Sequence, residues 1–138
     1  MESNQLSEHN TILVLGEYKI WRHTMKIDES ILNSVKKMLG LSTEYDYFDQ
    51  DIIMHINTTF MVLTQLGIGP VNGFYIQDES ATWDEFLGNE KNLEAVKTYI
   101  YLKVKLMFDP PLSNTVMECM KQNISELEWR LNHQTESN

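Results

Sequence analysis

An apolar stripe near the end of the chain constrains the fold more than any other feature of the sequence. Its side chains recur at intervals of four, four, four, three and four residues, at Leu112, Val116, Met120, Ile124, Leu127 and Leu131. Because an α-helix turns once every ~3.6 residues, this spacing places them on one helical face. Ser113 is a suitable N-cap. The pattern therefore predicts a helix over residues 114–133, about 30 Å long at ~1.5 Å per residue.

Two further stripes lie in the first half of the chain. Asp28 is a candidate N-cap for a short helix that Gly40 ends, because glycine readily adopts the positive φ of a helix C-terminus. Asp49 and Asp51 suit the positive end of a second helix. The apolar face of this second helix is wide, which predicts a central position, and it consists of Ile52, Ile53, Ile56, Phe60, Met61, Leu63 and Leu66.

A capping box precedes the remaining stripe. Thr82 and Glu85 have its spacing, in which each side chain bonds the other residue's amide, and they predict a single turn that ends at Gly88. Asn89 is a candidate N-cap for the next helix, which Asp109, Pro110 and Pro111 end because proline lacks an amide hydrogen. The stripe of this helix is Leu93, Val96, Ile100, Val104 and Met107, with Tyr99, Leu102 and Leu106 beside it.

Helical spacing is lost in a glycine-rich, acidic loop between these segments. Its characteristic residues are Gly67, Gly69, Pro70, Asn72, Gly73, Phe74, Tyr75, Asp78 and Glu79. Asn72-Gly73 is a turn pair that tolerates positive φ, and a brief extended piece is expected at residues 74–76. Large rings beside a loop, here Phe74, Tyr75 and Trp83, either contact a partner or pin the loop to the protein. Both interpretations stay open.

The sequence therefore predicts an all-α fold. We expect a small bundle of about four helices plus a one-turn helix, with an irregular Gly-rich loop or hairpin and a long C-terminal helix. A chain of 138 residues with 42% hydrophobic side chains is long enough for one such core. Residues 1–26 are expected to form an N-terminal extension, either a short strand or disordered, and residues 27–138 the helical domain.

Composition and spacing exclude several classes of function. Twenty acidic against eleven basic residues give a formal charge of −9, which disfavours tight binding of duplex DNA. The four histidines have no metal-ligand spacing, and no phosphate-binding or nucleophile motif is present, so neither a metal, a cofactor nor catalysis is expected. No segment is long and apolar enough for a membrane span, and we expect a soluble, intracellular protein. Cys119 is expected to be a buried, inert thiol.

The end of the predicted C-terminal helix carries a candidate partner surface. Leu127 and Leu131 continue the core stripe, whereas Trp129 lies on the opposite face and Arg130 follows it. A tryptophan on the outer face of a terminal helix favours a contact with another protein. The alternative is that Trp129 packs on the N-terminal segment around Ile20 and Trp21 of its own chain.

Six segments in this order resemble the head-tail connector, or adaptor, proteins of long-tailed bacteriophages and their prophages. They are residues 31–37 (ILNSVKK), 51–57 (DIIMHIN), 66–70 (LGIGP), 83–87 (WDEFL), 108–111 (FDPP) and 126–132 (ELEWRLN). The resemblance covers residues 27–133 and leaves residues 1–24 without a family counterpart. It implies a helical connector domain without catalysis.

The resemblance also implies partners and a location. The protein would assemble with itself into a ring, commonly of about twelve copies, beneath the portal protein at the capsid vertex. Its C-terminal helix, here Leu127, Trp129, Arg130 and Leu131, would meet the portal. The Gly67–Glu79 loop residues would face the channel or, at the opposite end, a stopper or other tail-proximal protein. Trp83, Asp109, Pro110 and Pro111 would be structural.

Such a protein would be assembled in the host bacterial cytoplasm and would belong to the virion, with no membrane contact. Duplex DNA would pass through its ring without specific binding, and an acidic wall suits that passage because it avoids phosphate contacts. The competing hypothesis is a small acidic helical regulatory or adaptor protein that binds another protein.

Overall fold

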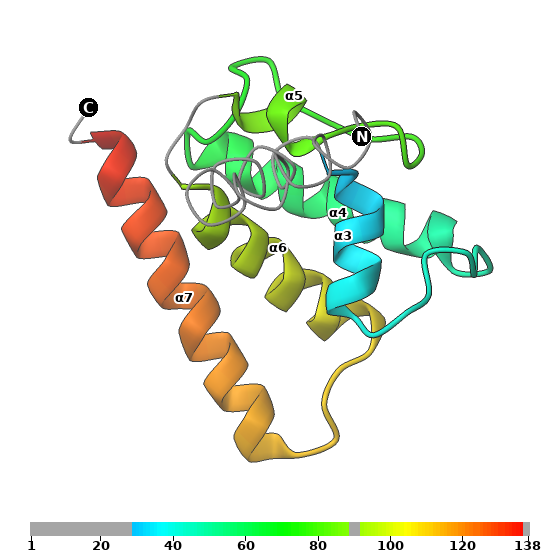
Figure 1. Ribbon diagram of the computed structural model, residues 1–138. Coiled ribbons are helices and arrows are strands. Elements are labelled where there is room, and N and C mark those ends of the chain that lie inside the picture. Colours follow the sequence, from blue (N-terminus) through cyan, green and yellow to red (C-terminus); the bar gives the residue numbers. More distant parts are fainter. Residues whose placement is uncertain (1–28, 89–91, 137–138) are drawn as a thin grey trace, which may run out of the picture.

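The computed structural model describes residues 29–88 and 92–136. Five helices occur in these ranges: α3 (Ile31–Met38), α4 (Asp49–Gln65), α5 (Trp83–Leu87), α6 (Leu93–Phe108) and α7 (Asn114–Glu136). No strand occurs in the same ranges, where Ser30 and Thr82 form an isolated antiparallel bridge. The all-α prediction is confirmed (Figure 1). The predictions for residues 1–26 and the contact of Trp129 with Ile20 and Trp21 lie outside the described residues.

Helices α4 and α6 form the centre of the bundle, and α3 and α7 pack against them (Figure 1). The core draws on both central helices, as their wide apolar stripes predict, and includes Ile52, Ile56, Phe60, Val96, Tyr99, Ile100 and Val104. Two residues assigned to these stripes lie outside the core. Met61 on α4 and Met107 on α6 are exposed: Met61 lies on the side of α4 away from Ile52, and Met107 lies in the last turn of α6, where α7 diverges from it.

The helix ends follow the expected chemistry, with shifts at two N-termini. Ser30, not Asp28, caps α3, and its Oγ accepts the amide of Asn33 at 3.2 Å. Asn92, not Asn89, is at the N-cap position of α6, but its side chain forms no capping hydrogen bond. At the other end of α3, Gly40 has φ +83° and its amide bonds the Lys37 carbonyl, so the predicted stop is confirmed.

A buried ion pair joins the first two helices. The Nζ of Lys36, which is 1% exposed, lies 2.8 Å from Asp49 Oδ1 at the start of α4 and donates to the Thr43 carbonyl at 3.1 Å. One side chain of α3 thus fixes both the beginning of α4 and the connection before it.

Trp83 pins α5 to the bundle and is fully buried. Its Nε1 donates to Ser34 Oγ of α3 at 2.9 Å, and Lys97 Nζ of α6 lies 5.5 Å from its ring centroid. Thr82 Oγ1 accepts the Glu85 amide at 3.4 Å, which confirms the first half of the capping box. The second contact differs from the prediction, because Glu85 Oε1 accepts the Thr82 hydroxyl at 3.5 Å.

The Gly-rich loop is anchored at both ends. Gly67 has φ +86°, and the amides of Gly67 and Ile68 bond the carbonyls of Thr64 and Leu63, which closes α4 in a Schellman arrangement. Further along, the Asn57 side chain bonds both the amide and the carbonyl of Ile76, at 2.7 and 2.9 Å. Ile68 and Ile76 are buried, so the loop lies on the core rather than away from it.

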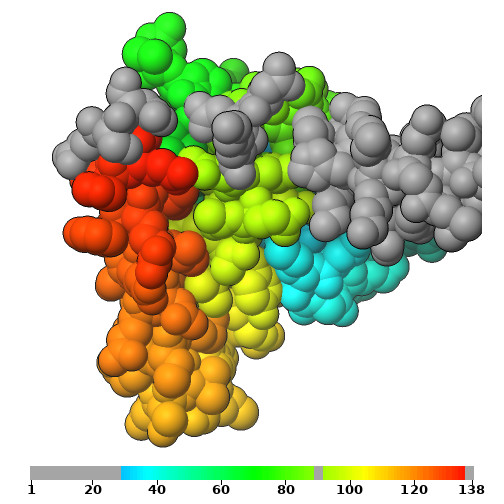
Figure 2. Space-filling model, turned by 60° about the vertical axis from the view of Figure 1, so that its left-hand side comes forward, coloured from blue at the N-terminus to red at the C-terminus, as the bar shows by residue number. Residues whose placement is uncertain are grey.

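Helix α7 packs on α6 through its second half. Ile124 and Leu131 are buried, whereas Leu112 and Val116, at the start of the same stripe, are exposed. The first turns of α7 project from the body, as Figure 2 shows for the orange end of the helix. The predicted stripe is therefore only half core, because α6 and α7 diverge towards the connection between them (Figure 1). For the same reason Cys119 is exposed, contrary to the prediction of a buried thiol.

Candidate interaction surface

The outer face of α7 carries an aromatic platform near its C-terminal end. Trp129 is 64% exposed, and its ring stacks on that of His133, with centroids 5.2 Å apart and planes 3° from parallel. Beside it, Arg130 donates to Glu126 Oε1 through Nε at 3.1 Å and Nη2 at 2.8 Å. We call Glu126, Trp129, Arg130 and His133 the α7 platform. The predicted outward orientation of Trp129 is confirmed.

The platform stands on a well-fixed part of the helix. Leu131 is 1% exposed and Leu127 is half-buried against the core, as the core stripe predicts. Tyr99 of α6 donates its hydroxyl to Glu128 Oε1 at 2.8 Å. Burial and the neighbouring Glu128 carboxylate raise the pKa of the Tyr99 hydroxyl well above its ordinary value. Of the four residues assigned to the portal by resemblance, Trp129 and Arg130 are therefore the two with exposed side chains.

A shallow hollow of about 360 Å³ adjoins the platform between α6 and α7. Its lining comprises Ala95, Leu127, Trp129, Arg130, Leu131, His133 and Gln134. A half-exposed ring beside an apolar hollow is the arrangement that protein partners use for an anchoring side chain.

The two aromatic residues of the Gly-rich loop, Phe74 and Tyr75, differ in their contacts. Phe74 packs edge-on against Phe60, with centroids 5.2 Å apart, and lies 5.2 Å from the Phe86 ring, so it pins the loop. Tyr75 is exposed and is available to a partner. Asp78 Oδ1 accepts both the hydroxyl and the amide of Ser80, and these bonds lower the pKa of the exposed Asp78 carboxyl.

The start of this loop lies beside the end of α7. Thr135 Oγ1 donates to the Leu66 carbonyl at 3.2 Å, and the position of a Cβ on Gly67 would be 3.5 Å from the Thr135 side chain. The resemblance places the C-terminal helix and the loop at opposite ends of the subunit. In this protein α4 and α7 end side by side, so the loop begins at the same end as the platform (Figure 1).

The residues assigned a structural role behave in two ways. Trp83 is core, as described above, whereas Asp109 and Pro110 are exposed in the connection between α6 and α7. Asp109 pairs with Lys105 at 2.6 Å and thereby holds the last turn of α6, from which the two prolines lead the chain away.

Sequence reasoning missed an aromatic cluster before α4. Tyr45 and Tyr47 stack with centroids 6.3 Å apart, both touch Phe48 edge-on, and Phe48 packs edge-on against Phe108 of α6 at 5.3 Å. Tyr45 and Tyr47 are 50% and 74% exposed. Three aromatic residues among four consecutive positions in an acidic segment were the available signal.

Two kinds of site are not found in the described residues. No group of three or more histidine, cysteine, aspartate or glutamate side chains within residues 29–88 and 92–136 is arranged to hold a metal ion. None of the helices described has the length and apolar content needed to cross a membrane.

Comparison with known proteins gives one family. The family model described as phage connector protein matches residues 31–138, which is most of the chain and includes every helix described here. Neither a curated protein nor a solved structure matches the chain significantly.

Proposed function

The chain belongs to the phage connector protein family, and from this premise we propose that it is a subunit of a ring that binds beneath the portal and joins the phage head to the tail. Membership gives the protein a structural role in the phage particle, in contact with other head or tail proteins. The contact with the portal, the ring and the DNA channel are what we propose beyond this structural role.

The α7 platform is the observation that carries the portal contact. Trp129 and His133 offer two stacked rings on the outer face of a helix whose inner face is fixed by Leu131 and by the Tyr99–Glu128 hydrogen bond. An exposed tryptophan on a rigid helix is the typical anchor of a protein interface, because it buries a large area at a small entropic cost. The adjacent hollow supplies room for a side chain of the portal.

The Gly-rich loop is the second contact of the proposal. Its exposed residues, with Tyr75, Asp78 and Glu79 among them, face either the channel or a stopper or other tail-proximal protein. Because the loop begins beside the end of α7, we assign its distant part, around residues 75–79, to these contacts rather than its start.

The DNA channel agrees with the charge of the chain. A formal charge of −9 repels phosphate groups, so a ring of such subunits lets duplex DNA pass without holding it. The ring of about twelve copies would assemble in the host bacterial cytoplasm and remain in the virion, and it would perform no catalysis.

The experiment is capture of the protein by a portal ring. We expect the wild-type chain to copurify with the portal protein of the same phage, and Trp129→Ala to weaken capture by at least about 2 kcal/mol, the scale of an interface anchor. Met54→Ala is the matched control, since Met54 on α4 is 57% exposed and belongs neither to the platform nor to the adjacent hollow. Thermal melting of both variants excludes a loss of folding.

Two results would contradict the proposal. Full portal capture by Trp129→Ala would remove the platform from the interface. A wild-type chain that ignores the portal but captures a host regulatory protein would favour the alternative, a small helical adaptor that binds another protein.

A further inference from the structure

One basic side chain in the described residues has no acidic partner. Six of the seven lysine and arginine residues in the ranges 29–88 and 92–136 form an ion pair: Lys36, Lys37, Lys97, Lys105, Lys121 and Arg130. Lys103, in the middle of α6, is the exception among them. In a chain with a formal charge of −9, a cation left unpaired within the folded subunit is available to an acid from another molecule.

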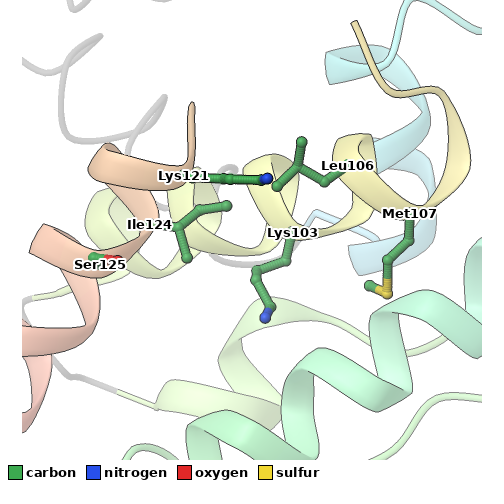
Figure 3. Close-up of a pocket in the computed structure, with 6 residues that line it drawn as sticks. All are labelled: Lys103, Leu106, Met107, Lys121, Ile124 and Ser125. Atoms are coloured by element: carbon green, nitrogen blue, oxygen red, sulfur yellow. The ribbon is translucent and has the colours of Figure 1, made fainter. Parts of the chain in front are cut away.

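Lys103 lies in a groove between α6 and α7 whose volume is about 400 Å³. The groove is lined by Lys103, Leu106, Met107, Lys121, Ile124 and Ser125 (Figure 3). Lys103 and Met107 extend from the same side of α6, and Ile124 reaches towards them from α7. The second cation is also largely available, because Lys121 meets Glu118 at 3.6 Å while both side chains are more than half exposed. The groove therefore suits a segment that is both acidic and apolar.

The same chain presents such a segment. In residues 44–47 the acids Glu44 and Asp46 alternate with Tyr45 and Tyr47, and all four are exposed. Neither acid forms an ion pair with the lysine and arginine residues of the described ranges. We call residues 44–47 the acidic tyrosine segment.

This segment is held in place before any partner binds. Phe48 links its rings to Phe108, and Lys36 donates to the carbonyl of Thr43 just before it. Binding by a segment that is already ordered loses little conformational entropy. Within one subunit the connection that carries the segment lies on the opposite side of α6 from α7 (Figure 1), and its contact with Phe108 holds it there, so we assign the groove to the segment of another copy.

We propose that the acidic tyrosine segment of one copy docks in the α6–α7 groove of the next copy. Glu44 and Asp46 then face Lys103 and Lys121, and a tyrosine ring covers Leu106, Met107 and Ile124. Two different faces are joined, so after one contact the first copy still has a free groove and the second a free segment, and the contact repeats until the ring closes. This pairing deepens the proposed ring and rests on it, because it names the surfaces that a ring would use.

The test is sedimentation of the full chain over a range of concentrations, with charge reversals on each side. We expect the wild type to associate with Kd below about 1 mM and Lys103→Glu to weaken association at least tenfold, roughly the effect of placing like charges opposite each other. The double variant Glu44→Lys/Asp46→Lys should weaken it equally. Lys37→Glu is the control, because it makes the same change of charge at an exposed lysine of α3 that lies outside the groove.

A mixture of the two defective proteins gives the sharpest readout. The lysine-bearing segment of the Glu44→Lys/Asp46→Lys variant meets the glutamate-bearing groove of the Lys103→Glu variant. The other contact joins the wild-type segment of the Lys103→Glu variant to the wild-type groove of the double variant. The mixture should therefore associate where each protein alone does not. A wild type that stays monomeric to about 1 mM, reversals without effect, or a mixture that fails to associate would each overturn the pairing. Portal capture by the same variants is scored separately, so failure of the pairing is distinguished from failure of the proposed function.

Discussion

Replacing leucine by alanine at three positions of the C-terminal stripe tests how α7 is attached. The sequence assigns Leu112, Leu127 and Leu131 to the same face of one helix. The structure separates them: Leu131 is 1% exposed, Leu127 is half-buried and Leu112 is fully exposed. A buried Leu→Ala change costs ~2–5 kcal/mol because transfer energy is lost and a cavity remains. An exposed one changes stability by less than ~0.5 kcal/mol.

We therefore expect a graded series. Leu131→Ala should lower the free energy of unfolding by about 3 kcal/mol, or roughly 10 °C in Tm for a domain of this size. Leu127→Ala should cost about half as much, and Leu112→Ala should be neutral. Urea denaturation followed by circular dichroism measures all three. Equal losses at the three positions would mean that the whole stripe is covered in solution, and no loss at Leu131 would mean that α7 does not pack on α6.

Three further predictions concern the core, the pH dependence and DNA. Gly69→Ala should destabilise by about 2–4 kcal/mol, because its Cβ would overlap the Phe86 ring and its φ is +85°. Gly40→Ala, at φ +83° with open space around it, should cost only ~1 kcal/mol of backbone strain, and thermal melts compare the two. The pKa of the Tyr99 hydroxyl is raised in the folded state, so this group ionises first in the unfolded chain and the free energy of unfolding should fall as pH rises above about 10. Tyr99→Phe should flatten that decline in alkaline denaturation. An unchanged decline would mean that Tyr99 is not its source. Duplex DNA binding at near-physiological salt should be negligible, because Lys97, Lys103 and Lys105 do not share a helical stripe and the net charge is −9; a salt-sensitive submicromolar affinity in fluorescence anisotropy would refute this.

The fold was predictable where local chemistry decides it. Helical periodicity identified the core of α4 and α6, and the stops at Gly40, Gly67 and the Asp109–Pro111 segment follow from backbone preferences that need no tertiary context. The caps moved by two or three residues because several serine, aspartate and asparagine residues compete near each start. Only the packed structure selects Ser30 and Asn92.

The interaction surfaces were less predictable, because exposure depends on which neighbour covers a face. Trp129 could be placed outside the core from its phase against Leu131, and it is exposed. The exposure of Leu112, Val116 and Cys119 could not be predicted in this way. Periodicity shows which face of a helix is apolar, but not the angle at which α7 diverges from α6. The unpaired state of Lys103 depends in the same way on the positions of all the acids around it.

Native mass spectrometry of the protein coexpressed with the portal protein of the same phage tests the proposed ring. We expect one closed complex in which a portal ring carries a ring of about twelve copies of this chain, one at each equivalent site. In the same experiment Trp129→Ala should leave the portal ring bare. A portal ring without bound copies of the wild-type chain, or with one or two copies rather than a closed set, would contradict the account.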